Sequence, residues 1–142
     1  MKGLNYILSM TIKYIKQTNN CGGIKMSNEL MKETMEESFK YIPKLINGID
    51  KEIEHISNGE YTEALSLLAY ILEGLDWSIQ AITLTSPLHG FSMDISKTNE
   101  SLNLLLTAIE NSDYQLISDV LNYEIKDILY SYMNHCRKGE LN

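Results

Sequence analysis

A long stripe of apolar residues constrains this sequence more than any other feature. Between residues 31 and 56 the apolar positions recur every three or four residues, the spacing that places side chains on one face of an α-helix. The stripe consists of Met31, Met35, Phe39, Ile42, Ile46, Ile49, Ile53 and Ile56. Because it keeps its phase on both sides of Pro43, the proline predicts a kink and not a second helix start. Asn58-Gly59 then predicts the end of the helix, since both residues tolerate the left-handed conformation.

Three further amphipathic segments follow, and the sequence lacks the alternating pattern of strands. They are expected at about residues 61–84, from Thr98 or Asn99 to about residue 110, and from residue 113 to about Cys136. The chain is therefore predicted to be all-α.

The turns that join these helices resemble each other. Asn58-Gly59-Glu60-Tyr61 and Asn111-Ser112-Asp113-Tyr114 lie 53 residues apart. One amphipathic hairpin cannot bury its apolar faces alone, which gives a physical reason for a pair. We predict an antiparallel four-helix bundle made of two αα-hairpins, at about residues 28–84 and 98–137, within one domain of residues 26–142.

Residues 1–25 differ in charge from the rest of the chain. They contain four lysines and no acidic residue, a net charge of +4, whereas residues 26–142 hold eight basic and 19 acidic residues, a net charge of −11. The segment is either an extra amphipathic helix that contacts a membrane surface through residues 1–20, or a mis-called leader. In the second case translation starts at Met26, because Gly22-Gly23-Ile24-Lys25-Met26 is what a ribosome-binding site and a start codon would encode.

The overall charge limits the partners. With 12 basic and 19 acidic residues among 142, the net charge is −7, which argues against nucleic acid or an anionic membrane as the main partner. No apolar run reaches the roughly 20 residues of a membrane-spanning helix. Two cysteines, Cys21 and Cys136, are too few for a disulfide framework and favour a cytoplasmic location.

Motifs for catalysis or metal binding are weak. Glu52-Ile53-Glu54-His55 has the Glu-x-x-His spacing of di-iron bundles, but the second copy that such a site needs is missing. His135 and Cys136 are neighbours in a predicted helix, so their side chains diverge by about 100°. Phosphate-binding glycine patterns are also missing. We expect no catalytic residue, no metal and no other cofactor.

Aromatic residues form a second face on two of the predicted helices. Tyr70 and Trp77 lie seven residues apart with Gly74 between them, and Tyr123 and Tyr130 occupy the equivalent positions at the 53-residue offset. A helix that is apolar on two faces is central in the fold or has a partner. Either the four rings pack between the second and fourth helices, where Gly74 allows a close approach, or they line a groove or a twofold interface.

Glu124 lies close to the apolar stripe of the last helix, near Leu121 and Ile128, with His135 further along. A buried carboxylate needs a partner or takes a raised pKa. Glu124 is therefore either an edge residue that reaches water or, together with His135, a polar anchor for a small molecule or a metal inside the bundle.

Three short stretches resemble a known family. Glu73-Gly74-Leu75-Asp76-Trp77, Glu110-Asn111-Ser112-Asp113-Tyr114 and Asp119-Val120-Leu121-Asn122-Tyr123-Glu124 are similar to segments of a family of small uncharacterised helical domains of Gram-positive bacteria. The resemblance covers about residues 41–132 and implies a bacterial, cytoplasmic, helical protein. That family has no assigned activity, so no catalytic residue carries over. The all-helical, acidic character is also similar to that of flagellar export chaperones.

These patterns favour a non-enzymatic, cytoplasmic interaction module of adaptor or chaperone-like type. A partner helix or a second copy of the chain would dock on the aromatic face, and an acidic rim of Glu73, Asp76, Asp119 and Asp127 would select a basic partner. The alternative is a small-molecule or metal-binding bundle that uses Glu124 and His135.

Overall fold

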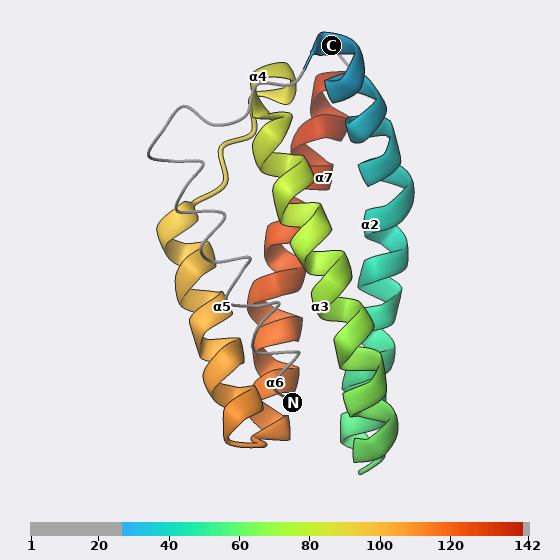
Figure 1. The fold of residues 1–142 in the computed structure, drawn as a ribbon, viewed down its shortest axis with the longest axis vertical. Helices are drawn as coiled ribbons and strands as arrows, with labels where there is room; N and C mark the ends of the chain where they lie inside the picture. Colours follow the sequence, from blue (N-terminus) through green and yellow to red (C-terminus); the bar gives the residue numbers. More distant parts are fainter. Residues whose placement is uncertain (1–26, 141–142) are drawn as a thin grey trace.

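The computed structural model describes residues 27–140, with side chains described as far as Lys138, and this part of the chain is all-α (Figure 1). Its elements are α2 (Asn28–Ser57), α3 (Tyr61–Leu84), α4 (Ser86–His89), α5 (Ile95–Glu110), α6 (Tyr114–Val120), the π-helical turn η1 (Leu121–Ile125) and α7 (Lys126–Glu140). No strand occurs between residues 27 and 140, so the predicted fold class is confirmed. The extra helix expected within residues 1–25 falls outside the described residues.

The helices form two antiparallel hairpins that pack into a four-helix bundle, as predicted. α2 lies along α3, and α5 lies along α6 and η1. The second hairpin packs on the first chiefly through α2, which contacts α6, η1 and α7. Figure 1 shows these helices side by side along the long axis, with the single turn α4 at one end. The run α6–η1–α7 is continuous and acts as one long helix.

The core lies between the four long helices and follows the predicted stripes. From the first stripe Met31, Ile42, Ile46, Ile49 and Ile56 are buried, while Met35, Phe39 and Ile53 are partly buried against the same cluster. The largest fully buried side chains include Ile42, Ile49, Leu68, Leu72, Leu102, Leu105 and Tyr132. Both hairpins therefore supply the core, as expected if neither can bury its apolar face alone.

α2 continues through Pro43 without a second start. Pro43 lies on the exposed face of the helix. The carbonyl that loses its amide partner four residues earlier can therefore bond to water, which lowers the cost of the proline. The N-terminus of α2 is capped by Ser27, whose hydroxyl accepts a hydrogen bond of 3.2 Å from the amide of Leu30.

The two hairpin turns have the same backbone conformation, as the repeat predicts. Asn58 (φ −88°, ψ 0°) and Asn111 (φ −91°, ψ 2°) end the first helix of each hairpin. The next residue has a positive φ in both turns, 73° at Gly59 and 51° at Ser112. The backbone hydrogen bonds also correspond: the amides of residues 60 and 113 each donate over 2.8 Å to a carbonyl five residues earlier.

The first residues of α3 and α6 show how the two hairpins are related. Tyr61 and Tyr114 are equivalent at the 53-residue offset, and their rings stack on each other with centroids 4.1 Å apart and an interplanar angle of 17°. The two hairpins therefore also contact each other where their second helices begin, in addition to the packing of α2 on the second hairpin.

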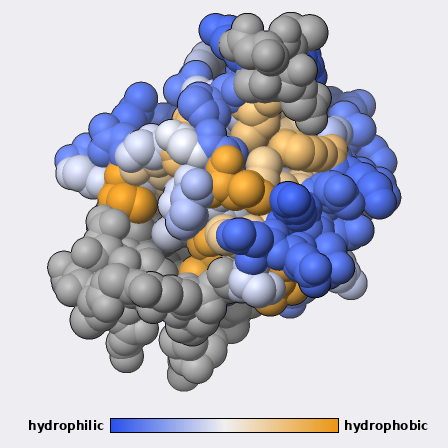
Figure 2. Space-filling model, turned by 90° about the horizontal axis from the view of Figure 1, so that it is seen from above, coloured by the Kyte–Doolittle hydropathy of each residue, from blue (hydrophilic) through white to orange (hydrophobic). Residues whose placement is uncertain are grey.

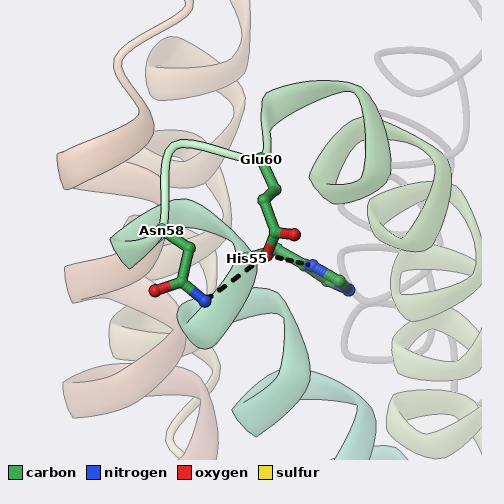
Figure 3. Close-up of polar contacts among 3 residues, drawn as sticks. All are labelled: His55, Asn58 and Glu60. Atoms are coloured by element: carbon green, nitrogen blue, oxygen red, sulfur yellow. Dashed lines mark hydrogen bonds and ion pairs between the residues drawn. The ribbon is translucent and has the colours of Figure 1, made fainter.

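The side chains of the two turns differ. In the first turn the Glu60 carboxylate accepts a hydrogen bond from Asn58 Nδ2 at 3.4 Å and lies 3.2 Å from His55 Nδ1 (Figure 3). In the second turn the Asp113 carboxylate instead accepts a hydrogen bond of 3.1 Å from the amide of Leu116 and caps α6. One backbone turn is thus stabilised by two different sets of side chains.

The connection between the hairpins is more ordered than predicted. α4 adds one helical turn, and α5 begins at Ile95, a few residues earlier than expected, because Asp94 caps it by accepting from the amide of Lys97 at 3.0 Å. The His89 ring links the end of α3 to the loop that follows α4. Its Nδ1 accepts from the amide of Phe91 at 2.9 Å, and its Nε2 lies 3.1 Å from the carbonyl of Ile82.

Apolar side chains are open to solvent at the end of the bundle that carries α4. Leu30 in α2 is 48% exposed and Leu88 in α4 is 39% exposed. Seen from this end, hydrophobic atoms lie at the surface between hydrophilic ones (Figure 2). Among the helices of residues 27–140, none has the length and apolar character needed to cross a bilayer.

Candidate docking groove

A close contact between α2 and α3 lies at the centre of the candidate site. Gly74 of α3 faces Tyr41 of α2, and a Cβ atom at position 74 would overlap the oxygen and the ring of that tyrosine. It would also come within 3.2 Å of Leu45 Cδ1. The glycine predicted to allow a close approach does so, but the residue that approaches is Tyr41 of the first helix, not an aromatic residue of the fourth.

The Tyr41 ring packs edge-on against the indole of Trp77, with ring centroids 5.4 Å apart and an interplanar angle of 77°. This is a favourable arrangement for two aromatic rings. Tyr70, Glu73, Gly74 and Trp77 follow the i, i+3, i+4, i+7 spacing and therefore share one face of α3. Trp77 stays 39% exposed and Tyr70 stays 72% exposed. These are large apolar surfaces for single side chains to present to water.

An open groove of about 620 Å³ runs along these residues between α2 and α3. It is lined by Glu37, Tyr41, Tyr70, Glu73, Gly74 and Trp77. A smaller hollow of about 170 Å³ shares Tyr41 and Tyr70 with it and continues toward Leu67 and Ile71. The two hollows therefore form one furrow, which we call the α2–α3 groove.

The groove has an acidic edge. Glu37 and Glu73 are the charged residues that line its larger part. Glu37 also lies 3.7 Å from Lys40, in a pair whose two side chains are both strongly exposed and therefore contribute little. Burial, and secondly the Glu73 charge, raise the pKa of Tyr41 above its ordinary value, so its hydroxyl remains protonated at neutral pH.

The structure does not bring the four predicted aromatic residues together. Tyr123 and Tyr130 belong to the second hairpin and are 72% and 46% exposed. Within residues 27–140, no ring contact joins either of them to Tyr70 or Trp77. The interpretation that the four rings pack in the core between the second and fourth helices is therefore wrong.

The π-helical turn η1 explains why the second pair does not match the first. In η1 the amide of Lys126 donates to the carbonyl of Leu121, five residues back, so one extra residue enters the helix. After η1, the buried positions of the two hairpins correspond at an offset of 54 residues and no longer at 53. The buried Leu75 and Ile82 of α3 correspond in this way to the buried Leu129 and Cys136 of α7. Tyr130 is therefore no longer equivalent to Trp77.

Glu124 and His135 do not form one pocket. They lie eleven residues apart on a continuous helical run, or about 16 Å at 1.5 Å per residue. His135 is exposed near α4, where its Nε2 lies 2.8 Å from the carbonyl of His89. Glu124 lies in η1, and its Oε2 is buried without a hydrogen-bond partner. The predicted joint site for a small molecule or metal is not formed by these two residues.

Glu52 is a buried acid that the sequence did not single out for this property. Its side chain is 1% exposed, and its Oε2 has no hydrogen-bond partner. Burial raises its pKa from 4.5 to about 7, although the nearby His55 opposes the shift. Among the described residues, no group of three histidine, cysteine or acidic side chains is arranged to hold a metal ion. Glu52 and His55 are therefore a pair of neighbours on α2 and not part of a metal cluster.

Comparison with protein families places the chain in one of them. Residues 33–135 match the family described as "Domain of unknown function (DUF8042)", and because the match covers most of the chain, the protein belongs to this family. The matched segment includes most of both hairpins, without the first residues of α2 and the last residues of α7, and the whole α2–α3 groove. No curated protein and no solved structure matches the chain significantly.

Proposed function

We propose that this protein is a non-enzymatic interaction module that holds an amphipathic helix of a partner protein in the α2–α3 groove. The observation that carries the proposal is the aromatic surface around Gly74, which consists of the exposed Tyr70 and Trp77 and the half-buried Tyr41. Clustered tyrosine and tryptophan side chains in a hollow are typical of the residues that dominate binding energy at interfaces. An amphipathic helix fits an elongated apolar groove with side chains spaced by one or two turns.

The acidic edge favours a basic partner. Glu37 and Glu73 line the groove, and Asp76 lies on the same helix as Trp77. Two further members of the predicted rim, Asp119 and Asp127, belong to the second hairpin and lie outside the groove. Charges at the edge of an interface chiefly affect the rate of association and the choice of partner.

The biological setting is part of the same proposal. An acidic, all-helical module without a membrane-spanning segment in its described part suits an adaptor or chaperone-like role in the cytoplasm of a Gram-positive bacterium. A second copy of the chain is the other occupant that the groove could accept.

Affinity capture with the tagged full chain tests the proposal, with Trp77→Ala as the variant and Tyr123→Ala as the matched control. Tyr123 is an aromatic residue of the second hairpin with the same 72% exposure as Tyr70. We expect one protein to be retained by the wild type and the control and to bind Trp77→Ala on the order of 30-fold more weakly. Circular dichroism and thermal melting check that the variant is folded.

One outcome would contradict the proposal, and a second variant covers the case in which Trp77→Ala does not fold. If Trp77→Ala is folded and retains the same protein, binding does not use the groove. If Trp77→Ala unfolds, Tyr70→Ala replaces it, because the more exposed Tyr70 side chain can be removed without disturbing the core. Sedimentation of the purified chain separates a bound partner from self-association.

A further inference from the structure

The Trp77 end of the α2–α3 groove has the chemistry of a cation-binding site. We propose that it binds the ammonium or guanidinium group of a lysine or arginine side chain presented by the partner, which rests on the proposed docking of a helix in this groove. Three aromatic rings from two helices, Tyr41, Tyr70 and Trp77, lie around the glycine floor, and the carboxylates of Glu37 and Glu73 stand at the edge.

Aromatic rings attract cations through the negative potential of their faces, and tryptophan is the strongest of the three aromatic side chains in this respect. The same site offers no fixed positive charge, because none of the residues that line the larger hollow is basic. Lys40 reaches Glu37 at 3.7 Å but is strongly exposed and free to turn away into water. A cation in the groove would therefore meet aromatic faces and carboxylates together.

A neutral apolar anchor fits this end less well. It would cover Glu37 and Glu73 without pairing with them, and a carboxylate that loses water without gaining a partner is costly. The Glu73 charge is felt at the centre of the groove, since it contributes to the raised pKa of Tyr41. A cationic side chain would instead pair with the carboxylates of Glu37 and Glu73 as they lose water, which offsets the cost of covering them.

The other end of the groove has the opposite character, which gives the site a direction. Beyond Tyr41 and Tyr70 the smaller hollow is lined by Leu45, Leu67 and Ile71, with Lys44 at its edge. Lys44 repels a second cation there, while the leucine and isoleucine side chains accept an apolar group. The occupant would therefore carry its cation toward Trp77 and an apolar side chain one to two helical turns away toward Leu67.

A matched pair of small probes tests the inference on the full-length chain. n-Butylguanidinium and n-butylurea have nearly the same shape and differ by one positive charge. Trp77 is the only tryptophan in the sequence, so its fluorescence and its indole N–H resonance report directly on the groove. We expect the guanidinium probe to bind on the order of tenfold more tightly than the urea probe and to shift the Trp77 signals.

Two variants locate the effect. In Glu37→Gln/Glu73→Gln the preference for the cation should fall to less than about threefold. Trp77→Leu leaves no tryptophan to observe, so its binding is measured by calorimetric titration, in which binding of both probes should be lost. Lys97, an exposed residue of α5, provides a control, since Lys97→Gln should leave both affinities unchanged. Equal binding of the two probes, or no response of Trp77 to either, overturns the cation site. The capture experiment with Trp77→Ala has a separate readout, so helix docking can stand when the cation preference fails.

Discussion

Gly74 illustrates at the residue scale how the groove depends on the absence of one methyl group. The Tyr41 ring occupies the place where a Cβ atom of residue 74 would lie, so a residue of α2 reaches the backbone of α3. Gly48 is the other glycine inside a long helix of the first hairpin, and a Cβ atom there would lie 3.9 Å from Ile71 Cγ1. That distance is an ordinary van der Waals contact, so the two glycines have opposite expected responses to alanine.

Gly74→Ala should lower the free energy of unfolding by about 1–2 kcal/mol, because displacing the Tyr41 ring costs more than the gain in helix propensity. Gly48→Ala should raise it by about 0.5–1 kcal/mol, because only the propensity changes. Urea denaturation of the two variants measures both effects. Equal stabilisation by both substitutions would mean that Tyr41 does not need Gly74.

Glu52 shows a second residue-scale conflict, between charge and burial. Its position corresponds to Leu105 in the second hairpin, which is fully buried, so an acid stands where the repeat places an apolar residue. Below about pH 4.5 the carboxyl is protonated in both the folded and the unfolded chain. As the pH rises from 4.5 to about 7, the unfolded chain loses this proton and the folded chain keeps it, so stability falls across this window.

Glu52→Gln should remove this loss and raise the free energy of unfolding at pH 8 by about 1–3 kcal/mol, with less effect at pH 4. Glu54→Gln is the matched control, because Glu54 is an exposed acid on the same helix. Urea denaturation at pH 4, 6 and 8 gives the measurement. A Glu52→Gln variant with the same pH dependence as the wild type would show that the buried carboxyl does not control it.

At the scale of elements, the sequence predicts the helices well, because the apolar residues that recur with helical periodicity are the residues that the fold buries. The stripe of residues 31–56 keeps one phase, and the structure buries that face. Helical periodicity does not predict the π-helical turn η1, since one extra residue shifts which side chains face the core without interrupting the helix. The contact of Tyr41 with Gly74 could not be predicted from periodicity either. This contact depends on which face of α3 meets α2, and no spacing within one helix contains that information.

The two turns allow a test at the same scale. The position with a positive φ is a glycine, Gly59, in the first hairpin and a serine, Ser112, in the second. Ser112 has φ 51°, a region that costs most non-glycine residues about 1 kcal/mol or more. Ser112→Gly should therefore raise the free energy of unfolding by about 0.5–1 kcal/mol. Gly59→Ala should destabilise it by about 1 kcal/mol, although a Cβ atom there meets nothing within 4 Å. Thermal melting that gives both changes the same sign would contradict this reasoning.

At the scale of the whole molecule, the two hairpins are alike as scaffolds and different as surfaces. Their turns and buried stripes correspond, but only the first hairpin places a tyrosine of one helix against a glycine of the other. In the second hairpin, Asp94 is equivalent to Tyr41 at the offset of 53 residues. Ile128, which follows η1, is equivalent to Gly74 at the offset of 54 residues. The site therefore arises where the two hairpins differ, which a pattern of repeated residues cannot predict.

The docking of the two hairpins can be tested at the pair of stacked tyrosines, Tyr61 and Tyr114. If Tyr61 and Tyr114 help to dock one hairpin on the other, Tyr61→Ala and Tyr114→Ala should each destabilise the protein. The double variant should then lose about 0.5–1.5 kcal/mol less than the sum of the two single losses. Tyr61→Ala combined with Tyr123→Ala is the control, since Tyr123 makes no ring contact within the described residues, and these two effects should add. Additive effects for Tyr61 and Tyr114 would mean that the stacked pair does not contribute to docking and that the buried stripes alone hold the two hairpins together.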